Sequence, residues 1–178
     1  MVRLLAERDP GLVVATSATT RDPRPGEVDG VDYHFVTDEE FDRMVAEDEF
    51  LEWAPVFGRR YGTLASTVEV DLAVGRDVLL EIDVQGARAV RQRMPGAVLV
   101  FIEPPSEAEL HRRLMSRGTE EDNEVARRLT AAADEMARAG EFDHRVVNDD
   151  LGRAVDQVLA IIEGTRVPAH HDPGKEPS

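Results

Sequence analysis

From residue 66 onward, short apolar stretches alternate with segments of helical character, and this alternation constrains the fold more than any other feature of the sequence. Strands separated by helices cannot be joined by tight hairpins, so they pair in parallel and the helices cover the sheet. The pattern therefore predicts an α/β fold around a parallel sheet. The expected strands are 11–18, 77–83, 97–103 and 144–148, and the expected helices are 66–73, 85–94, 106–116, 119–139 and one that begins after Asp149 or Asp150.

Residues 31–63 do not follow this alternation and predict a small β-rich lobe inserted into the sheet. Short strands are expected at 31–36, 50–56 and 60–63. The sequence Thr37-Asp-Glu-Glu40 is a capping box that begins a helix between the first two. We expect one folded domain over 1–166, a helical lid region over about 106–140 and a disordered tail over 167–178.

The composition excludes several classes of function. The chain has 178 residues, of which 42% are apolar, and a formal charge of −15, so a nucleic-acid or membrane-surface binder is not expected. It has no Cys, which excludes disulfides, thiolate catalysis and Cys-ligated zinc, and its five His show no metal-ligand spacing. No stretch approaches the ~20 apolar residues of a membrane span. We expect a cytoplasmic protein with no metal ligands, and no protein partner is predicted.

A loop at residues 20–30 carries two arginines three positions apart, Arg21 and Arg24, beside Pro23 and Pro25. The planar guanidinium group suits phosphate, and each charge-assisted contact contributes roughly 1.5–3 kcal/mol. The loop is therefore a candidate phosphate site. Two solvated loop arginines are an equally good interpretation.

Two carboxylates are candidates for reading a base. Glu52, between Leu51 and Trp53, can accept two hydrogen bonds from guanine, whose N1–H and 2-amino group adenine lacks. The alternative is an exposed residue on an edge strand. Asp83 follows an apolar strand, where ligands of parallel sheets bind, and can meet a ribose, a base or hydrated magnesium. The alternative for Asp83 is the N-cap of the next helix.

Arginines cluster around Gly118, where two expected helices meet. A glycine hinge between helices makes a plausible lid, and its arginines can stabilise a phosphoryl group in transfer. The alternative is pairing along a solvated helix, such as Glu124 with Arg128. The cluster comprises Arg112, Arg113, Arg117, Arg127 and Arg128.

Taken together, these segments resemble the guanylate kinase family, which phosphorylates GMP with ATP. The resemblance runs from about Val2 to Arg166 and rests on S-A-T-T-R-x-P-R-x-G-E, G-x-D-Y-x-F, E-F-L-E-W, Y-G-T, L-E-I-D-V-Q-G, R-G-T and V-V-N-D-D. It implies a P-loop kinase core with a GMP-binding lobe and a lid, with ATP as donor and nucleotide-bound Mg²⁺.

The resemblance also assigns roles to individual residues. The GMP phosphate is expected at Arg21, Arg24, Tyr33 and Tyr61, with Glu27 beside them, and guanine at Ser17, Glu52, Thr63 and Asp83. Arg117 and Arg128 are expected to act on the ATP phosphates as catalytic residues, and Asn148 to lie near the adenine.

The sequence departs from the family pattern at its start. Met1-Val-Arg-Leu-Leu resembles the middle of the helix that follows the family's phosphate-binding loop, no G-x-x-x-x-G-K-[ST] occurs internally, and the only lysine is Lys175. We expect the chain as written to lack the first strand and the P-loop, through a misplaced start codon or a truncated gene, and to turn GMP over orders of magnitude more slowly than the family. The alternatives are a non-catalytic module that binds GMP or phosphopeptides, and a fragment that folds poorly.

Overall fold

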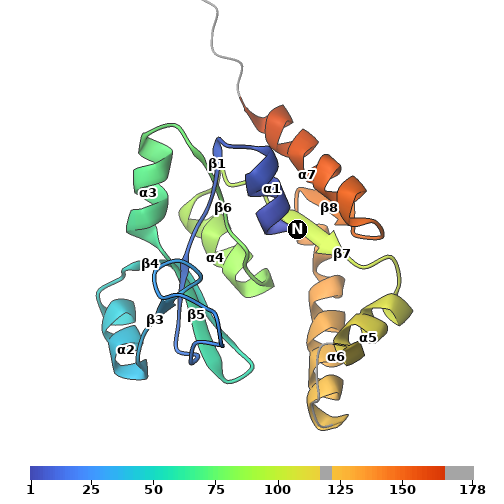
Figure 1. The fold of residues 1–178 in the computed structure, drawn as a ribbon, viewed down its shortest axis with the longest axis horizontal. Helices are drawn as coiled ribbons and strands as arrows, with labels where there is room; N and C mark the ends of the chain where they lie inside the picture. Colours follow the sequence, from blue (N-terminus) through green and yellow to red (C-terminus); the bar gives the residue numbers. More distant parts are fainter. Residues whose placement is uncertain (117–121, 167–178) are drawn as a thin grey trace, which may run out of the picture.

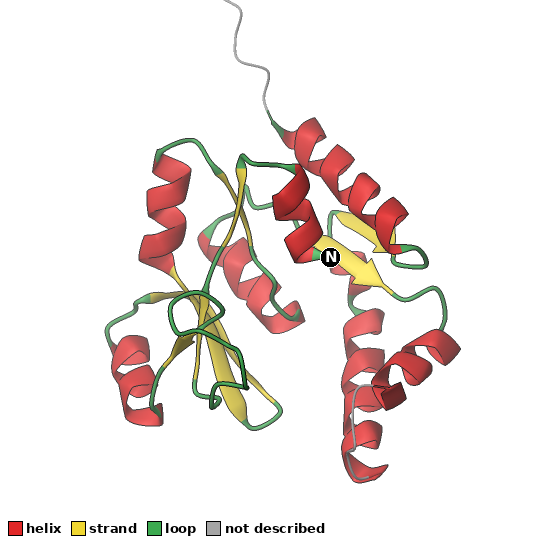
Figure 2. Ribbon diagram, viewed as in Figure 1, coloured by secondary structure: helices red, strands yellow, loops and turns green. Residues whose placement is uncertain are grey.

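The computed structural model describes residues 1–116 and 122–166, without the side chains of Leu114, Ser116 and residues 122–128. It shows the expected mixture of parallel strands and covering helices (Figures 1 and 2). Strand β1 (Leu12–Val14) pairs in parallel with β6 (Asp77–Leu79), and β7 (Val100–Glu103) pairs in parallel with β8 (His144–Val147). The predicted parallel α/β class is confirmed.

Several strands are shorter than the sequence predicts. The expected strand over 11–18 is two strands, because the chain leaves β6 after Ala15 and enters a second sheet as β2 (Ser17–Thr19). Strand β1 is the hydrogen-bonding partner of β6. Because β1 ends there, residues 80–83 have no neighbouring strand to pair with, and the expected strand over 77–83 ends at Leu79. The expected strand over 97–103 begins only at Val100.

The second sheet has the order β3-β2-β5-β4 and forms the lower left of Figure 1. Strands β4 (Phe50–Val56) and β5 (Arg59–Leu64) are antiparallel, and β5 is also antiparallel to β2. The predicted strand over 31–36 is only β3 (His34–Phe35), parallel to β2. Helix α2 (Asp38–Ala46) begins at the predicted cap, where Thr37 Oγ1 accepts from the Glu40 N–H at 3.1 Å.

Helices cover both parallel pairs. Helices α1 (Val2–Arg8) and α7 (Leu151–Thr165) lie side by side and share an apolar cluster that includes Leu12 of β1 and Val146 of β8. Asp150 is the N-cap of α7, since its Oδ1 accepts from the Arg153 N–H at 2.9 Å. The other helices are α3 (Ala65–Ala73), α4 (Val84–Arg93), α5 (Glu107–Ser116), α6 (Asp122–Ala137) and the 3₁₀ turn η1 (Ala139–Glu141).

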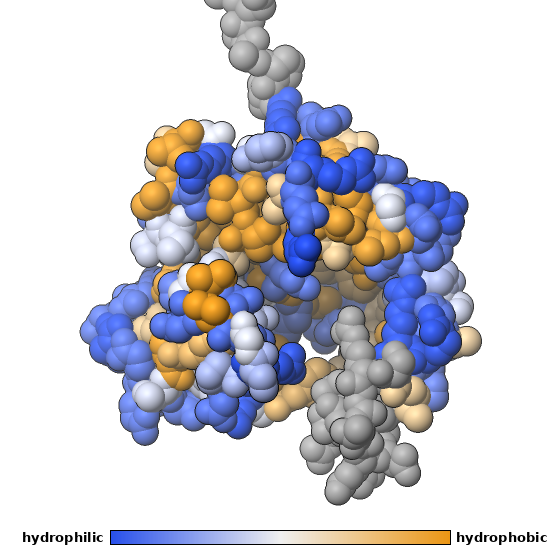
Figure 3. Space-filling view, in the orientation of Figure 1, coloured by the Kyte–Doolittle hydropathy of each residue, from blue (hydrophilic) through white to orange (hydrophobic). Residues whose placement is uncertain are grey.

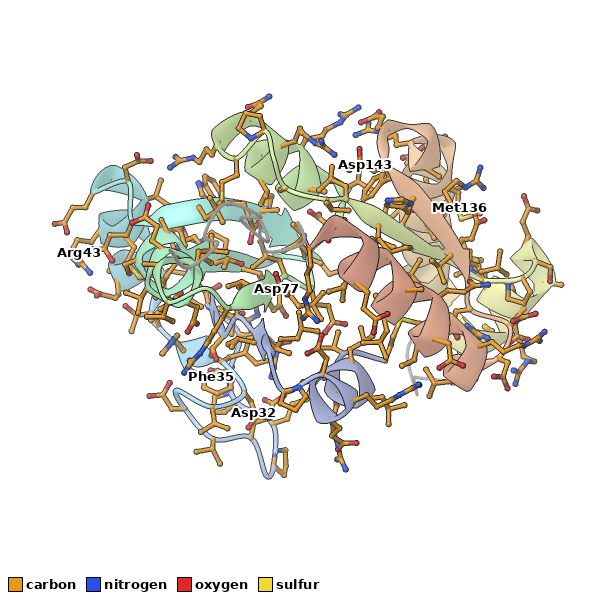
Figure 4. All side chains as sticks on the ribbon, turned by 90° about the horizontal axis from the view of Figure 1, so that it is seen from above. Asp32, Phe35, Arg43, Asp77, Met136 and Asp143 are labelled. Carbon is orange, nitrogen blue, oxygen red and sulfur yellow. The ribbon has the colours of Figure 1, made fainter. Side chains whose placement is uncertain are left out.

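The molecule is hollowed between the second sheet and the helices α5 and α6. Figure 3 shows this depression in the lower half, with β2–β5 on one side and α5–α6 on the other. Viewed from above, Asp32 and Phe35 lie on the side opposite Met136 of α6 (Figure 4). Within residues 1–116 and 122–166, no helix is long and apolar enough to cross a bilayer.

Gly62 makes the second sheet sensitive to a single added methyl group. A Cβ at this position would lie 2.6 Å from Phe50 Cδ1 and 2.9 Å from Trp53 Cβ. We expect Gly62→Ala to lower the free energy of unfolding by roughly 2–3 kcal/mol, because a buried ring must move away. Urea denaturation measures the loss. In the matched variant Gly96→Ala the new Cβ meets nothing within 4 Å, and equal stability losses in the two variants would contradict the prediction.

Candidate active site

Three polar side chains form a row across β2, β5 and β4. Ser17 and Glu52 both lie opposite Thr63 in the strand register, so the three residues share one face of the sheet. The Thr63 hydroxyl donates to Glu52 Oε1 at 2.7 Å. Although β4 is an edge strand, Glu52 is only 6% exposed. The alternative of an exposed edge glutamate is therefore wrong.

Asp83 lies at the start of α4, next to this row. It is the N-cap of the helix: its Oδ1 accepts from the Gly86 N–H at 2.8 Å, and its Oδ2 accepts from Gln85 Nε2 at 3.2 Å. The cap interpretation is confirmed. Burial raises the pKa of the Glu52 carboxyl, the Thr63 hydroxyl opposes this rise, and the negative charge of Asp83 adds to it. Asp83 is thus held near Glu52 as a second carboxylate.

The pKa of Glu52 leads to a pH-dependent stability difference. Because its pKa is raised above the ordinary 4.5, the folded protein takes up this proton at a higher pH than the unfolded chain does. Glu52→Gln, which carries no charge, should therefore be more stable than the wild type at pH 7, and this advantage should shrink as the pH falls toward 4.5. Urea denaturation of both proteins at pH 7 and pH 5 measures it. A difference independent of pH would contradict the prediction.

The Arg21 guanidinium forms an ion pair within the protein and is largely shielded from solvent. Its two terminal nitrogens donate to the two oxygens of Glu27, both at 2.9 Å, and the two side chains are only 14% and 19% exposed. The guanidinium carbon lies 5.2 Å from the centre of the Tyr33 ring. Hydrogen bonds that the Arg21 guanidinium donates to Glu27 and Tyr61 raise the pKa of Arg21 above its usual range. The interpretation as a solvated loop arginine is wrong for Arg21.

The loop around Arg21 is tied to β5. Glu27 Oε2 also accepts the Arg24 N–H at 2.6 Å, while the Arg24 side chain is exposed. The rings of Tyr33 and Tyr61 meet edge-on at 6.1 Å. Tyr61 and Thr63 are two positions apart on β5, so they face the same side and lie about 7 Å apart. Two groups of side chains are therefore neighbours on one face of β5. We call them the Glu52 row, formed by Ser17, Thr63 and Glu52, and the Arg21 cluster, formed by Arg21, Arg24, Glu27, Tyr33 and Tyr61.

The residues expected at ATP, and the arginines around Gly118, are described to different extents. Arg117 lies outside the described residues, and of Arg127 and Arg128 only the backbone on α6 is described. Arg112 and Arg113 both pair with Glu109 along α5, at 2.6 and 2.7 Å, as the helix-pairing alternative proposes. Asn148 follows β8, and its carbonyl accepts from Arg113 Nη2 at 2.9 Å.

Sequence reasoning missed Glu135 of α6. Partial burial and the negative charge of Asp83 both raise the pKa of the Glu135 carboxyl. A glutamate among helix-forming residues gives no sequence signal for such a position. Among residues 1–116 and 122–166, no group of three or more acidic or histidine side chains is arranged to hold a metal ion.

Comparisons with known proteins agree on one family. The family model described as guanylate kinase matches residues 2–165. Curated guanylate kinases from Dechloromonas aromatica and Thermobifida fusca are 50% and 52% identical, over 93% and 91% of this chain and 82% and 83% of theirs. The crystal structure of guanylate kinase from Anaplasma phagocytophilum superposes with a TM-score of 0.78 at 35% identity, over 92% of this chain and 79% of that one. With a matching sequence and fold, the chain belongs to the guanylate kinase family.

Proposed function

We propose that the face formed by β2, β5 and β4 binds GMP, with guanine at the Glu52 row and the phosphate at the Arg21 cluster. The family consists of ATP:GMP phosphotransferases. The proposal assigns the residues of this chain that recognise GMP, the acceptor nucleotide.

One observation carries the base assignment. Glu52 is buried, yet within the described part of the chain no arginine or histidine forms an ion pair with it. A buried carboxylate without sufficient donors is costly, so a ligand that supplies two N–H groups stabilises it. The N1–H and 2-amino group of guanine are such donors, and adenine would leave the carboxylate unpaired. Thr63, Ser17 and Asp83 then lie around the rest of the base edge.

The phosphate assignment rests on the Arg21 cluster. Glu27 fixes the guanidinium plane, the Tyr61 hydroxyl bonds to it, and the Tyr33 ring lies 5.2 Å from its carbon. Arg24 brings a second, exposed guanidinium into the same loop. A nucleotide phosphate bound here accepts charge-assisted hydrogen bonds from a group whose orientation is already set, which reduces the entropy lost on binding.

For the donor side, we propose ATP with Mg²⁺ carried by its phosphates. A phosphate oxygen of GMP attacks the γ-phosphorus, the bond to the bridging oxygen breaks, and ADP leaves. Arg117 and Arg128 are proposed to stabilise the charge of that transfer, and Asn148 to lie near the adenine. Slow turnover by the 178-residue polypeptide stays a prediction. A coupled assay tests it, and rapid turnover of GMP would contradict it.

Calorimetric titration tests the binding proposal. GMP should bind the 178-residue protein, and AMP should bind about 100-fold more weakly or not at all, because it leaves Glu52 unpaired. A phosphoserine peptide serves as the second ligand. If the peptide binds and neither nucleotide is preferred, the protein is a phosphopeptide module and the proposal is wrong.

A further inference from the structure

We propose that Gly86 is a positioning residue that sets both base-reading carboxylates, Glu52 and Asp83, at once. This inference rests on the proposed GMP site and assigns a determinant of its selectivity. It follows from two features of Gly86. Its N–H group donates a hydrogen bond, and the Cβ that it lacks leaves room for the Glu52 carboxylate.

The first contact fixes Asp83. The Gly86 N–H donates to Asp83 Oδ1 at 2.8 Å, as the third residue of α4 does in an N-cap. This bond occupies one carboxylate oxygen and leaves Oδ2 on the side of Gln85. Any residue except proline can donate this bond, so it does not require glycine.

The second contact does require glycine. A Cβ at position 86 would lie 2.6 Å from Glu52 Oε2 and 3.2 Å from Glu52 Cδ, closer than a methyl group and a carboxylate can approach. The Glu52 carboxylate is therefore held on one side by the Thr63 hydroxyl and rests on the other against the bare α-carbon of Gly86. Both oxygens of Glu52 thereby have fixed positions.

The backbone gives no other reason for a glycine here. Gly86 is buried inside α4 and is not one of the glycines with a positive φ. Glycine is a poor helix former, so alanine would favour the helix by itself. Ile82 Cβ would lie 3.2 Å from the added Cβ, but the 2.6 Å approach of Glu52 Oε2 is the tighter contact and distinguishes the position. Since that carboxylate is the end of a flexible side chain, an added methyl group can displace it without unfolding the protein.

The test is Gly86→Ala in the 178-residue protein, titrated with GMP, IMP and AMP. IMP lacks the 2-amino group and so engages one fewer donor. We expect GMP affinity to fall about 10- to 100-fold, as for one misplaced charge-assisted hydrogen bond. AMP affinity should change by less than about threefold, and the melting temperature should stay the same or rise. Gly164→Ala on α7, whose Cβ meets nothing within 4 Å, is the matched helical control and should bind GMP normally.

A double-mutant cycle separates positioning from general damage. In Gly86→Ala/Glu52→Asp the shorter side chain withdraws the carboxylate from the new methyl group, so Gly86→Ala should cost far less GMP affinity in the Glu52→Asp background. Unchanged GMP affinity in Gly86→Ala, a fall in its melting temperature, or equal losses in both backgrounds would overturn the inference. A wild type that fails to prefer GMP over AMP would instead overturn the proposed function.

Discussion

Glu52→Gln is expected to weaken GMP binding by about 100- to 1,000-fold, because two hydrogen bonds to a buried carboxylate are replaced by one neutral bond and one mismatch. The glutamine oxygen can accept from guanine N1–H, but its amide N–H₂ then faces the 2-amino group, donor against donor. IMP has no 2-amino group and should lose much less affinity. The ratio of GMP to IMP affinity, measured by calorimetry, should therefore fall toward one.

Glu69→Gln, an exposed position on α3, is the matched control for the loss of one negative charge. It should leave GMP affinity within about twofold of the wild type, since exposed charges act weakly over distance in salt. The Glu52→Gln protein should also fold, because burying the neutral glutamine side chain does not remove a charge from water. If Glu52→Gln binds GMP within threefold of the wild type, Glu52 does not read the base.

Local side-chain bonds made parts of the fold predictable from the sequence. Thr37 and Ser106 each accept from the N–H three positions on, at 3.1 and 3.2 Å, and their helices begin where the capping boxes predict. Strand ends were predicted less well because they depend on partners far along the chain. Residues 80–83 alternate apolar and acidic side chains as a strand can, but β1 departs to the second sheet at that point.

The site was predictable where residue type alone limits the chemistry, and less so where geometry decides. A glutamate between apolar residues allowed both a buried acceptor and an exposed edge residue, and the structure buries Glu52. Asp83 was compatible with a ligand and with a cap, and only the 2.8 Å bond from the Gly86 N–H establishes the cap. Glu135 was missed because its approach to Asp83 depends on how α6 packs, which no local pattern encodes.

Arg21→Ala is expected to weaken GMP binding by about 100- to 1,000-fold, more than the two lost hydrogen bonds alone would suggest. The structure gives the reason: Arg21 holds both oxygens of Glu27. Its removal leaves that carboxylate without its partner beside the bound phosphate, and two like charges then repel at short range. Guanosine, which has no phosphate, should bind the variant as it binds the wild type.

The repulsion can be measured separately by removing Glu27 as well. Arg21→Ala/Glu27→Ala should bind GMP more tightly than Arg21→Ala, because the unpaired carboxylate is gone while the lost hydrogen bonds are the same in both. Arg76→Lys, at the exposed pair with Asp71, is the control and should leave GMP affinity unchanged. Equal losses for GMP and guanosine in Arg21→Ala would show that Arg21 supports the fold of the loop, and the phosphate assignment would then be wrong.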